Sequence, residues 1–321
     1  MEAAQAEMNA PRRVVFIRSL GQSGSTLLTL MLDSHPLVLG LGELRRIHEA
    51  EAGNICGICR GACAFWDQTV SLPFMRRIAS KAAGTTLPRR MLGRLRRTLP
   101  ARLDRYLPQL SYHGGIYDHL FERSDYPILV DSTKHPDWAS AQLSCGSQWE
   151  DATPMIVFLT RDGRAVVNSN RRAHPEMTIE ELTGDWMKKF ADLCAFYESY
   201  QGAKFHITYE DLATKPSTAV EELCAFLGVS FWPPMIEYWN HEHHILGGSA
   251  GARSLIRHVG SDGVAASVVE PRTWHGDYYA SHDQAILLDE RWRTELSQRD
   301  LEYFEKTAGE MNRTFQYGKA P

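Results

Sequence analysis

Short apolar runs alternate with helical stretches along much of the chain. Four runs rich in β-branched or other apolar residues predict buried strands, at residues 13–18, 127–131, 154–160 and 204–209. The helices predicted around them cover residues 25–33, 165–172, 178–200 and 216–228. Strands that alternate with helices indicate an α/β fold, with a parallel sheet that carries helices on both faces.

One edge of such a sheet is where a ligand site is expected. Parallel strands end at the same edge, and ligands bind beyond their carboxyl ends. The loops after Arg18, Asp131 and Thr160 all belong to that edge. We therefore look for the chemistry of the chain in these three loops.

Composition narrows the class of protein. The chain has 321 residues, of which 43% are hydrophobic and 23% charged, so it can bury a sizeable core. We expect a flexible N-terminus at residues 1–12 and a single domain over 13–321, with a helical insertion that contains Cys and Arg at about 45–125. A net charge of −4 argues against nucleic acid as a partner.

The N-terminus does not resemble a secretory signal, because it lacks an apolar core segment. No run approaches the roughly 18 consecutive apolar residues of a spanning helix. We therefore expect no membrane span and a cytoplasmic location.

The loop after the first strand has the features of an anion site. Gly21, Gly24, Ser25 and Thr26 stand at a predicted helix N-terminus, where backbone N–H groups and the helix dipole attract negative charge. The alternative is an ordinary strand–helix turn with a serine cap. An ATP- or GTP-hydrolysing loop carries Lys directly after the second glycine, and this chain has Ser25 there.

A second candidate anion site follows the third strand. Arg161 stands at the end of that strand, and Ser169 lies eight residues later on the next predicted helix. The planar, permanently charged guanidinium suits a phosphate. The alternative is a surface ion pair between Arg161 and Asp162.

Taken together, these segments resemble the sulfotransferases that use 3′-phosphoadenosine 5′-phosphosulfate (PAPS). Similar segments occur in family order at residues 21–28, 33–36, 42–43, 161–169, 209–228 and 289–296. The layout is closest to the bacterial, carbohydrate and tyrosylprotein branches. The resemblance implies a P-loop-like α/β fold, with the inserted region on the acceptor side.

The resemblance also assigns the nucleotide contacts. It implies that the donor's 5′-phosphate and sulfate are held by Ser23, Gly24, Ser25 and Thr26. Gln22 belongs to the same loop, but the family usually has Arg or Lys at that position. Glutamine donates a hydrogen bond without bringing charge, so either neighbours such as Arg18 or Lys134 compensate or this position is not essential.

Further nucleotide contacts are implied downstream. Arg161 and Ser169 correspond to the residues that hold the 3′-phosphate. Tyr209 begins another family segment, and Arg253 ends a Gly-rich loop that the family places near the nucleotide. We include both as expected cofactor-binding residues.

Glu43 and Lys134 fall where the tyrosylprotein branch carries its catalytic base and catalytic lysine. In an in-line sulfuryl transfer, a carboxylate takes the acceptor proton and a lysine stabilises charge on the leaving phosphate. This scheme requires no metal. The alternatives are a helix N-terminal carboxylate for Glu43 and a surface loop lysine for Lys134.

The resemblance leaves the acceptor open. A hydroxyl or an amine on a small molecule, a glycan or a peptide would serve. The oligomeric state is open too, with a dimer among the alternatives. The rival functions are a nucleotide kinase, which would lose activity in EDTA because it needs Mg²⁺, and a nucleotide-binding protein without turnover.

Three of the six cysteines are close in sequence, at Cys56, Cys59 and Cys63. We interpret this segment as a structural loop with a redox-labile disulfide. The alternative is a zinc site that would need a fourth ligand such as His48. His241, His243 and His244 also suggest metal binding, but adjacent side chains such as His243 and His244 point apart on a helix.

Two other features have ordinary explanations. The basic residues 89–105 predict an amphipathic helix, because leucines recur at helical spacing, and the alternative is a surface for an anionic acceptor. Trp186 and Tyr197 could line an acceptor pocket, but core packing accounts for both.

Overall fold

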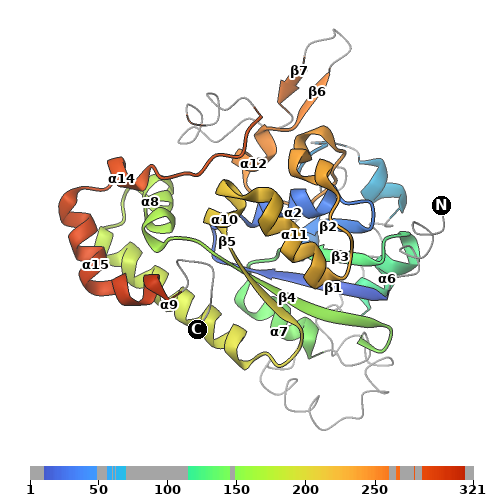
Figure 1. Cartoon of the computed structure of the whole chain (residues 1–321), viewed down its shortest axis with the longest axis horizontal. Helices are drawn as coiled ribbons and strands as arrows, with labels where there is room; N and C mark the ends of the chain where they lie inside the picture. Colours follow the sequence, from blue (N-terminus) through green and yellow to red (C-terminus); the bar gives the residue numbers. More distant parts are fainter. Residues whose placement is uncertain are drawn as a thin grey trace. The chain divides into compact units, whose positions relative to one another are not determined.

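A computed structural model describes residues 11–48, 56–59, 61, 63–69, 115–144, 149–259, 265–267, 278 and 284–314 (Figure 1). The strands are β1 Arg12–Arg18, β2 Val38–Gly42, β3 Ile128–Asp131, β4 Ala152–Thr160, β5 Lys204–Thr208, β6 Arg257–Val259 and β7 Ala265–Ser267. The α-helices are α2 Ser25–Asp33, α6 Ile116–Arg123, α7 Pro136–Leu143, α8 Gly163–Ala173, α9 Ile179–Ser199, α10 Tyr209–Thr214, α11 Pro216–Leu227, α12 Ala250–Ser254, α14 Trp292–Glu295 and α15 Gln298–Arg313. Short helices of other types are η1 Leu44–His48, η2 Phe65–Thr69 and η4 Pro233–Asn240.

Five strands form a parallel sheet in the order β2-β3-β1-β4-β5, flanked by helices, as the sequence predicts. The last five residues of β1 and the last six of β4 are all buried. A continuous apolar run, rather than an alternating one, is typical of a parallel strand that is covered on both faces. A second sheet pairs β6 with β7 in antiparallel orientation.

The described contacts divide the chain into two compact units, each built from separate stretches. The first unit comprises Met1–Phe16, His35–Met155 and His243–Gly248. In this unit β3 pairs with both β1 and β2. The short segment at 243–248 lies along the end of β2, where the Leu246 N–H donates to the Leu41 carbonyl (3.0 Å).

The second unit comprises Ile17–Ser34, Ile156–Glu242 and Ser249–Pro321. Figure 1 shows α15 beside α9, and a cluster around Phe158, Trp186 and Phe304 fills the space among β4, α8, α9 and α15. At Gly163 a Cβ would come within 2.5 Å of Trp186, so only glycine allows this close packing. Tyr197 stacks on Phe158 at 4.7 Å, and Trp186 is buried, so both aromatics pack in the core.

The four strands at 13–18, 127–131, 154–160 and 204–209 and the four helices at 25–33, 165–172, 178–200 and 216–228 are present, with ends within two residues of those expected. Helix α6 lies within the insertion that was predicted to be helical, whereas the sequence interpretation missed β2, α7, α10, α12, β6, β7, α14 and α15. In β2 two glycines interrupt a run of five residues, which hides the strand. The basic residues 89–105, most of the predicted insertion and nearly all of residues 1–12 lie outside the described residues. The single-domain organisation stays a prediction.

Among the described helices, none is long and apolar enough to cross a membrane.

Candidate functional site

The loop between β1 and α2 presents an uncapped helix N-terminus. Gln22 and Gly24 both adopt left-handed backbone angles, with φ of 66° and 86°. The helix begins at Ser25 with Gly24 at its cap, and no side chain hydrogen-bonds the cap. The serine-capped turn is therefore not what forms, and the first-turn N–H groups keep their capacity to bind an anion. Ser23, Ser25 and Thr26 are buried at this turn.

Arg161 is bound to this loop. Its Nη1 donates to the Gln22 carbonyl at 2.7 Å, and its Nη2 donates to the Asp289 carbonyl at 3.0 Å. The same Nη2 lies 3.2 Å from the Asp289 carboxylate, and the guanidinium stacks 4.2 Å above the Tyr209 ring. The alternative considered for Arg161, an ion pair with Asp162, does not form, because Asp162 pairs with Arg164. Arg161 thus fixes the shape of the loop between β1 and α2, residues 19–24, which we call the anion loop.

Tyr209 closes the other side of the loop. A Cβ at Gly24 would lie 2.7 Å from the Tyr209 ring, which explains why glycine occupies that position. The Tyr209 hydroxyl donates to the Leu287 carbonyl and accepts from the Asp289 N–H. Burial raises the pKa of the Tyr209 phenol, so it remains a neutral donor.

Asp289 is a residue of this group that the sequence interpretation did not single out. Burial acts to raise the pKa of its carboxyl, but the hydrogen bond from Arg291 and the charges of Arg161 and Arg291 hold that pKa well below its usual range. The stretch 289–296 does resemble a family segment. The contact of Asp289 with Arg161, 128 positions away, carries no local signal.

Ser169 lies apart from these contacts, on α8. It is buried, and its hydroxyl accepts from Arg172 Nη2 at 3.3 Å. Arg172 in turn pairs with Glu295, which also accepts from the Asn168 amide. Within the described residues no hydrogen bond joins Ser169 to Arg161, so the two predicted 3′-phosphate contacts are not brought into direct contact.

Arg253 lies on α12 next to a contact with the anion loop. Its Nε donates to the Ser249 carbonyl at 3.3 Å, and the Ser249 N–H donates to the Thr26 hydroxyl at 2.8 Å. The Gly-rich segment thus reaches the first helical turn through Thr26.

Glu43 and Lys134 form an ion pair in the first unit. Glu43 follows β2, and Lys134 follows β3, its parallel neighbour in the sheet. Lys134 Nζ donates to Glu43 Oε1 at 2.5 Å, and Arg46 lies 3.6 Å from the other carboxylate oxygen. The two side chains are 20% and 24% exposed, so a ligand can still reach them. The structure brings these two predicted catalytic residues together.

Asp131 organises the loop that carries Lys134. Its buried carboxylate accepts hydrogen bonds from the Tyr117 hydroxyl, the Trp138 indole and the Thr133 N–H, each at 2.7–2.8 Å. Burial raises the pKa of this carboxyl, and the three donors oppose that rise. Thr133 also accepts from the Arg45 N–H, which ties the Lys134 loop to the Glu43 loop.

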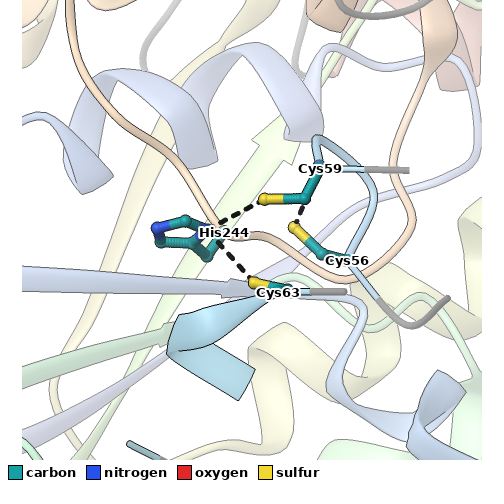
Figure 2. A group of neighbouring side chains, drawn as sticks. All are labelled: Cys56, Cys59, Cys63 and His244. Carbon is teal, nitrogen blue, oxygen red and sulfur yellow. Dashed lines mark hydrogen bonds between the residues drawn. The ribbon is translucent and has the colours of Figure 1, made fainter. Parts of the chain in front are cut away.

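A group of metal-ligating side chains lies elsewhere in the first unit. Figure 2 shows Cys56, Cys59, Cys63 and His244 pointing toward one another, and their ligand atoms all lie within 4.8 Å of each other. All three cysteines are free thiols, so the expected disulfide does not form. Burial raises the pKa of the Cys56 and Cys59 thiols.

The histidines separate instead of forming the cluster that their spacing suggested. His244 joins the cysteines, in the place considered for His48, whose side chain lies outside the described residues. His241 Nε2 lies 3.1 Å from the Pro234 carbonyl oxygen, and its ring lies 5.2 Å from the Trp232 ring, tilted by 57°. His244 is 181 positions from Cys63, which explains why sequence spacing did not find it.

Comparison with known proteins supports the resemblance found in the sequence. Residues 152–234 match the model of a sulfotransferase family, and no curated protein matches. This stretch includes Arg161, Ser169 and Tyr209. This match confirms the resemblance to that family.

Two solved structures that are similar to this chain cover nearly all of it. The sulfotransferase domain of the Synechococcus PCC 7002 olefin synthase is 17% identical with a TM-score of 0.51, and the match covers 93% of this chain and 95% of that one. The sulfotransferase domain from the curacin biosynthetic pathway is 17% identical with a TM-score of 0.47, covering 97% and 99%. The likeness to the olefin synthase domain shows that the fold is the sulfotransferase fold.

Proposed function

We propose that this protein is a sulfotransferase that moves a sulfuryl group from PAPS to an acceptor hydroxyl or amine. The observation that carries the proposal is the family match over residues 152–234, which includes the second predicted anion motif at 161–169. The uncapped N-terminus of α2 supports it, because it suits the phosphosulfate end of the donor. A retinol dehydratase solved with retinol and PAP (3′-phosphoadenosine 5′-phosphate, the product nucleotide) is also structurally similar, at 13% identity and a TM-score of 0.40 over 98% of this chain and 85% of that one.

In this proposal the loop residues 22–26 hold the 5′-phosphosulfate. Gln22 contributes its side-chain amide, and its backbone carbonyl is fixed by Arg161. The cation that the family usually has at this position is absent, so backbone N–H groups and the hydroxyls of Ser23, Ser25 and Thr26 provide most of the binding. The 3′-phosphate is assigned to Ser169 and Arg161, with Tyr209 and Arg253 as neighbouring contacts.

Glu43 is proposed as the general base. As the acceptor oxygen or nitrogen bonds to sulfur, the bond between sulfur and the 5′-phosphate oxygen breaks, and Glu43 takes the acceptor proton. The ion pair with Lys134 supports this role, because it fixes the position of the carboxylate. Lys134 is proposed to transfer its hydrogen bond from Glu43 to the leaving phosphate, where charge develops. The transfer itself uses no metal.

Calorimetry with PAP is the direct test. We expect tight binding of PAP and much weaker binding of adenosine 5′-phosphate, which lacks the 3′-phosphate. Sulfuryl transfer from PAPS should then proceed with no added Mg²⁺, in contrast to kinase chemistry. Absence of PAP binding at high micromolar concentration would overturn the proposal.

A further inference from the structure

Cys56, Cys59, Cys63 and His244 present four ligand atoms of the kind that bind zinc. Cys59 Sγ and Cys63 Sγ lie 3.4 and 3.3 Å from the same nitrogen, His244 Nδ1. In a tetrahedral site with Zn–S near 2.3 Å and Zn–N near 2.0–2.1 Å, neighbouring sulfur and nitrogen ligands are about 3.5 Å apart. The observed separations therefore fit ligands that surround a single zinc ion.

The surroundings of these side chains favour bound thiolates. The backbone N–H groups of Ile58 and Cys59 both point at Cys56 Sγ, each at 3.4 Å, and such donors stabilise a negatively charged sulfur. The His244 ring is held in place by stacking on Phe65, with ring centroids 5.1 Å apart and planes within 3°. The Trp66 indole donates to the His244 carbonyl. These contacts keep Nδ1 directed at the sulfurs (Figure 2).

We propose that Cys56, Cys59, Cys63 and His244 form a structural zinc site. Three sulfurs and one imidazole nitrogen select zinc over magnesium or calcium, which prefer oxygen ligands. Four protein ligands complete a tetrahedron and leave no position for a substrate, so the ion stabilises the fold and does not take part in the reaction.

The site joins two segments far apart in sequence. Cys56 forms an antiparallel bridge with Leu246, and the Gly57 N–H donates to the Ile245 carbonyl at 2.7 Å. Leu246 also accepts from the Glu43 N–H at 2.7 Å. A zinc ion here would hold the strand-like segment 243–248 against the end of β2, where Glu43 begins its loop. If Glu43 is the base proposed above, zinc fixes the backbone that positions it.

The first experiment measures metal in the purified full chain. Protein made in zinc-supplemented medium and purified with reductant should contain one zinc per chain by elemental analysis. Replacement by Co²⁺ should produce a thiolate-to-metal charge-transfer band and the strong visible absorption of tetrahedral cobalt. A reduced, folded chain that retains no zinc and gives no such spectrum with Co²⁺ overturns the proposal. A disulfide among these cysteines that persists after treatment with reductant overturns it as well.

Variants connect the metal to these residues. Cys59→Ser and His244→Gln should each weaken zinc binding strongly, because each removes a metal ligand. The loss should exceed roughly 10–100-fold, which is the effect of removing a residue that only hydrogen-bonds to a ligand. Cys194→Ser and Cys224→Ser, which lie outside the cluster, should keep one zinc per chain. Cys59 is exposed, so its serine variant should still fold, and circular dichroism checks this. Equal zinc content in all four variants overturns the assignment. None of these measurements uses PAPS. The zinc proposal can therefore be wrong while the proposed sulfotransferase activity is correct, and the activity can be wrong while the zinc proposal is correct.

Discussion

At the residue scale, the anion loop depends on a glycine that no other residue can replace without strain. Gly24 combines a φ of 86° with the Tyr209 ring directly over the place of a Cβ. Gly21, three residues earlier in the same loop, has no positive φ, and a Cβ added there would meet no atom within 4 Å. Alanine substitutions at the two glycines therefore distinguish the effect of backbone strain from the effect of replacing any glycine in this loop.

Gly24→Ala is expected to destabilise the chain by about 1–3 kcal/mol, from the left-handed backbone and the contact with Tyr209. Urea denaturation measures the loss, and calorimetry should show weaker PAP binding because the loop must shift. Gly21→Ala is the matched control and should change both quantities little. If the two variants behave alike, the backbone angle at Gly24 does not determine the loop.

Glu43→Gln tests the proposed base at the same scale. The amide keeps the size of the side chain but cannot accept the acceptor proton, so turnover should fall by roughly 10²–10⁴-fold. PAP affinity should stay within about twofold, because no proposed nucleotide contact changes. Glu122→Gln, an exposed position on α6, is the control and should be fully active. A Glu43→Gln enzyme with normal turnover would remove the base assignment.

The residue roles that the sequence could suggest were those inside continuous motifs. Lys134 and the loop residues 22–26 follow predicted strands, so their place at a strand end could be predicted. Glu43 follows β2, which was missed, and only the family resemblance singled it out. The partners that fix them could not, because Asp289 lies 128 positions from Arg161. A contact between distant positions depends on the fold and leaves no local pattern.

At the scale of elements, the sequence pattern identified what is long and apolar. β1, β4 and α9 carry strong periodic or continuous signals, whereas β2 is short and two of its five residues are glycine. Amphipathic α15 was not predicted, although Phe304 and Ala308, four positions apart, are both buried against the β4–α9 core. Local patterns thus predicted elements better than the contacts between them.

His206 lies on β5, which pairs with β4, and it makes the stability of the folded chain depend on pH. Its Nε2 lies 2.9 Å from the Thr160 hydroxyl, and Phe158 lies opposite it in the pairing. Burial lowers the pKa of His206 to about 4, while nearby Asp211 opposes the shift. In the unfolded chain the imidazole titrates near pH 6.5. As pH falls from 6.5 toward 4, only the unfolded state gains this proton, so the folded state loses stability.

His206→Gln should therefore flatten the loss of stability between pH 6.5 and pH 4, by up to about 3 kcal/mol over that range. Urea denaturation at several pH values gives the slope for each protein. His174→Gln, which removes a histidine at an exposed position, is the matched control. Identical slopes for His206→Gln and the wild type would show that the buried imidazole does not couple to folding.

At the scale of the whole molecule, each compact unit is built from stretches that are far apart in the sequence. The residues proposed to bind the donor come from Ile17–Ser34, Ile156–Glu242 and Ser249–Pro321, which together make up one unit. A site assembled from three stretches exists only when that unit is folded. A ligand of such a site binds the native state alone and stabilises it by mass action.

PAP at about 100 times its Kd should therefore stabilise the folded chain by about 2.7 kcal/mol, seen as a higher midpoint of thermal unfolding. Adenosine 5′-phosphate at the same concentration should shift the midpoint much less, because the proposed contacts of Ser169 and Arg161 have no phosphate to bind. Ser169→Ala should reduce the advantage of PAP over adenosine 5′-phosphate, whereas the exposed control Ser199→Ala should leave it unchanged. Equal shifts with both nucleotides would mean that Ser169 and Arg161 do not bind the 3′-phosphate. The ligands of the two predicted anion sites would then have to be determined separately.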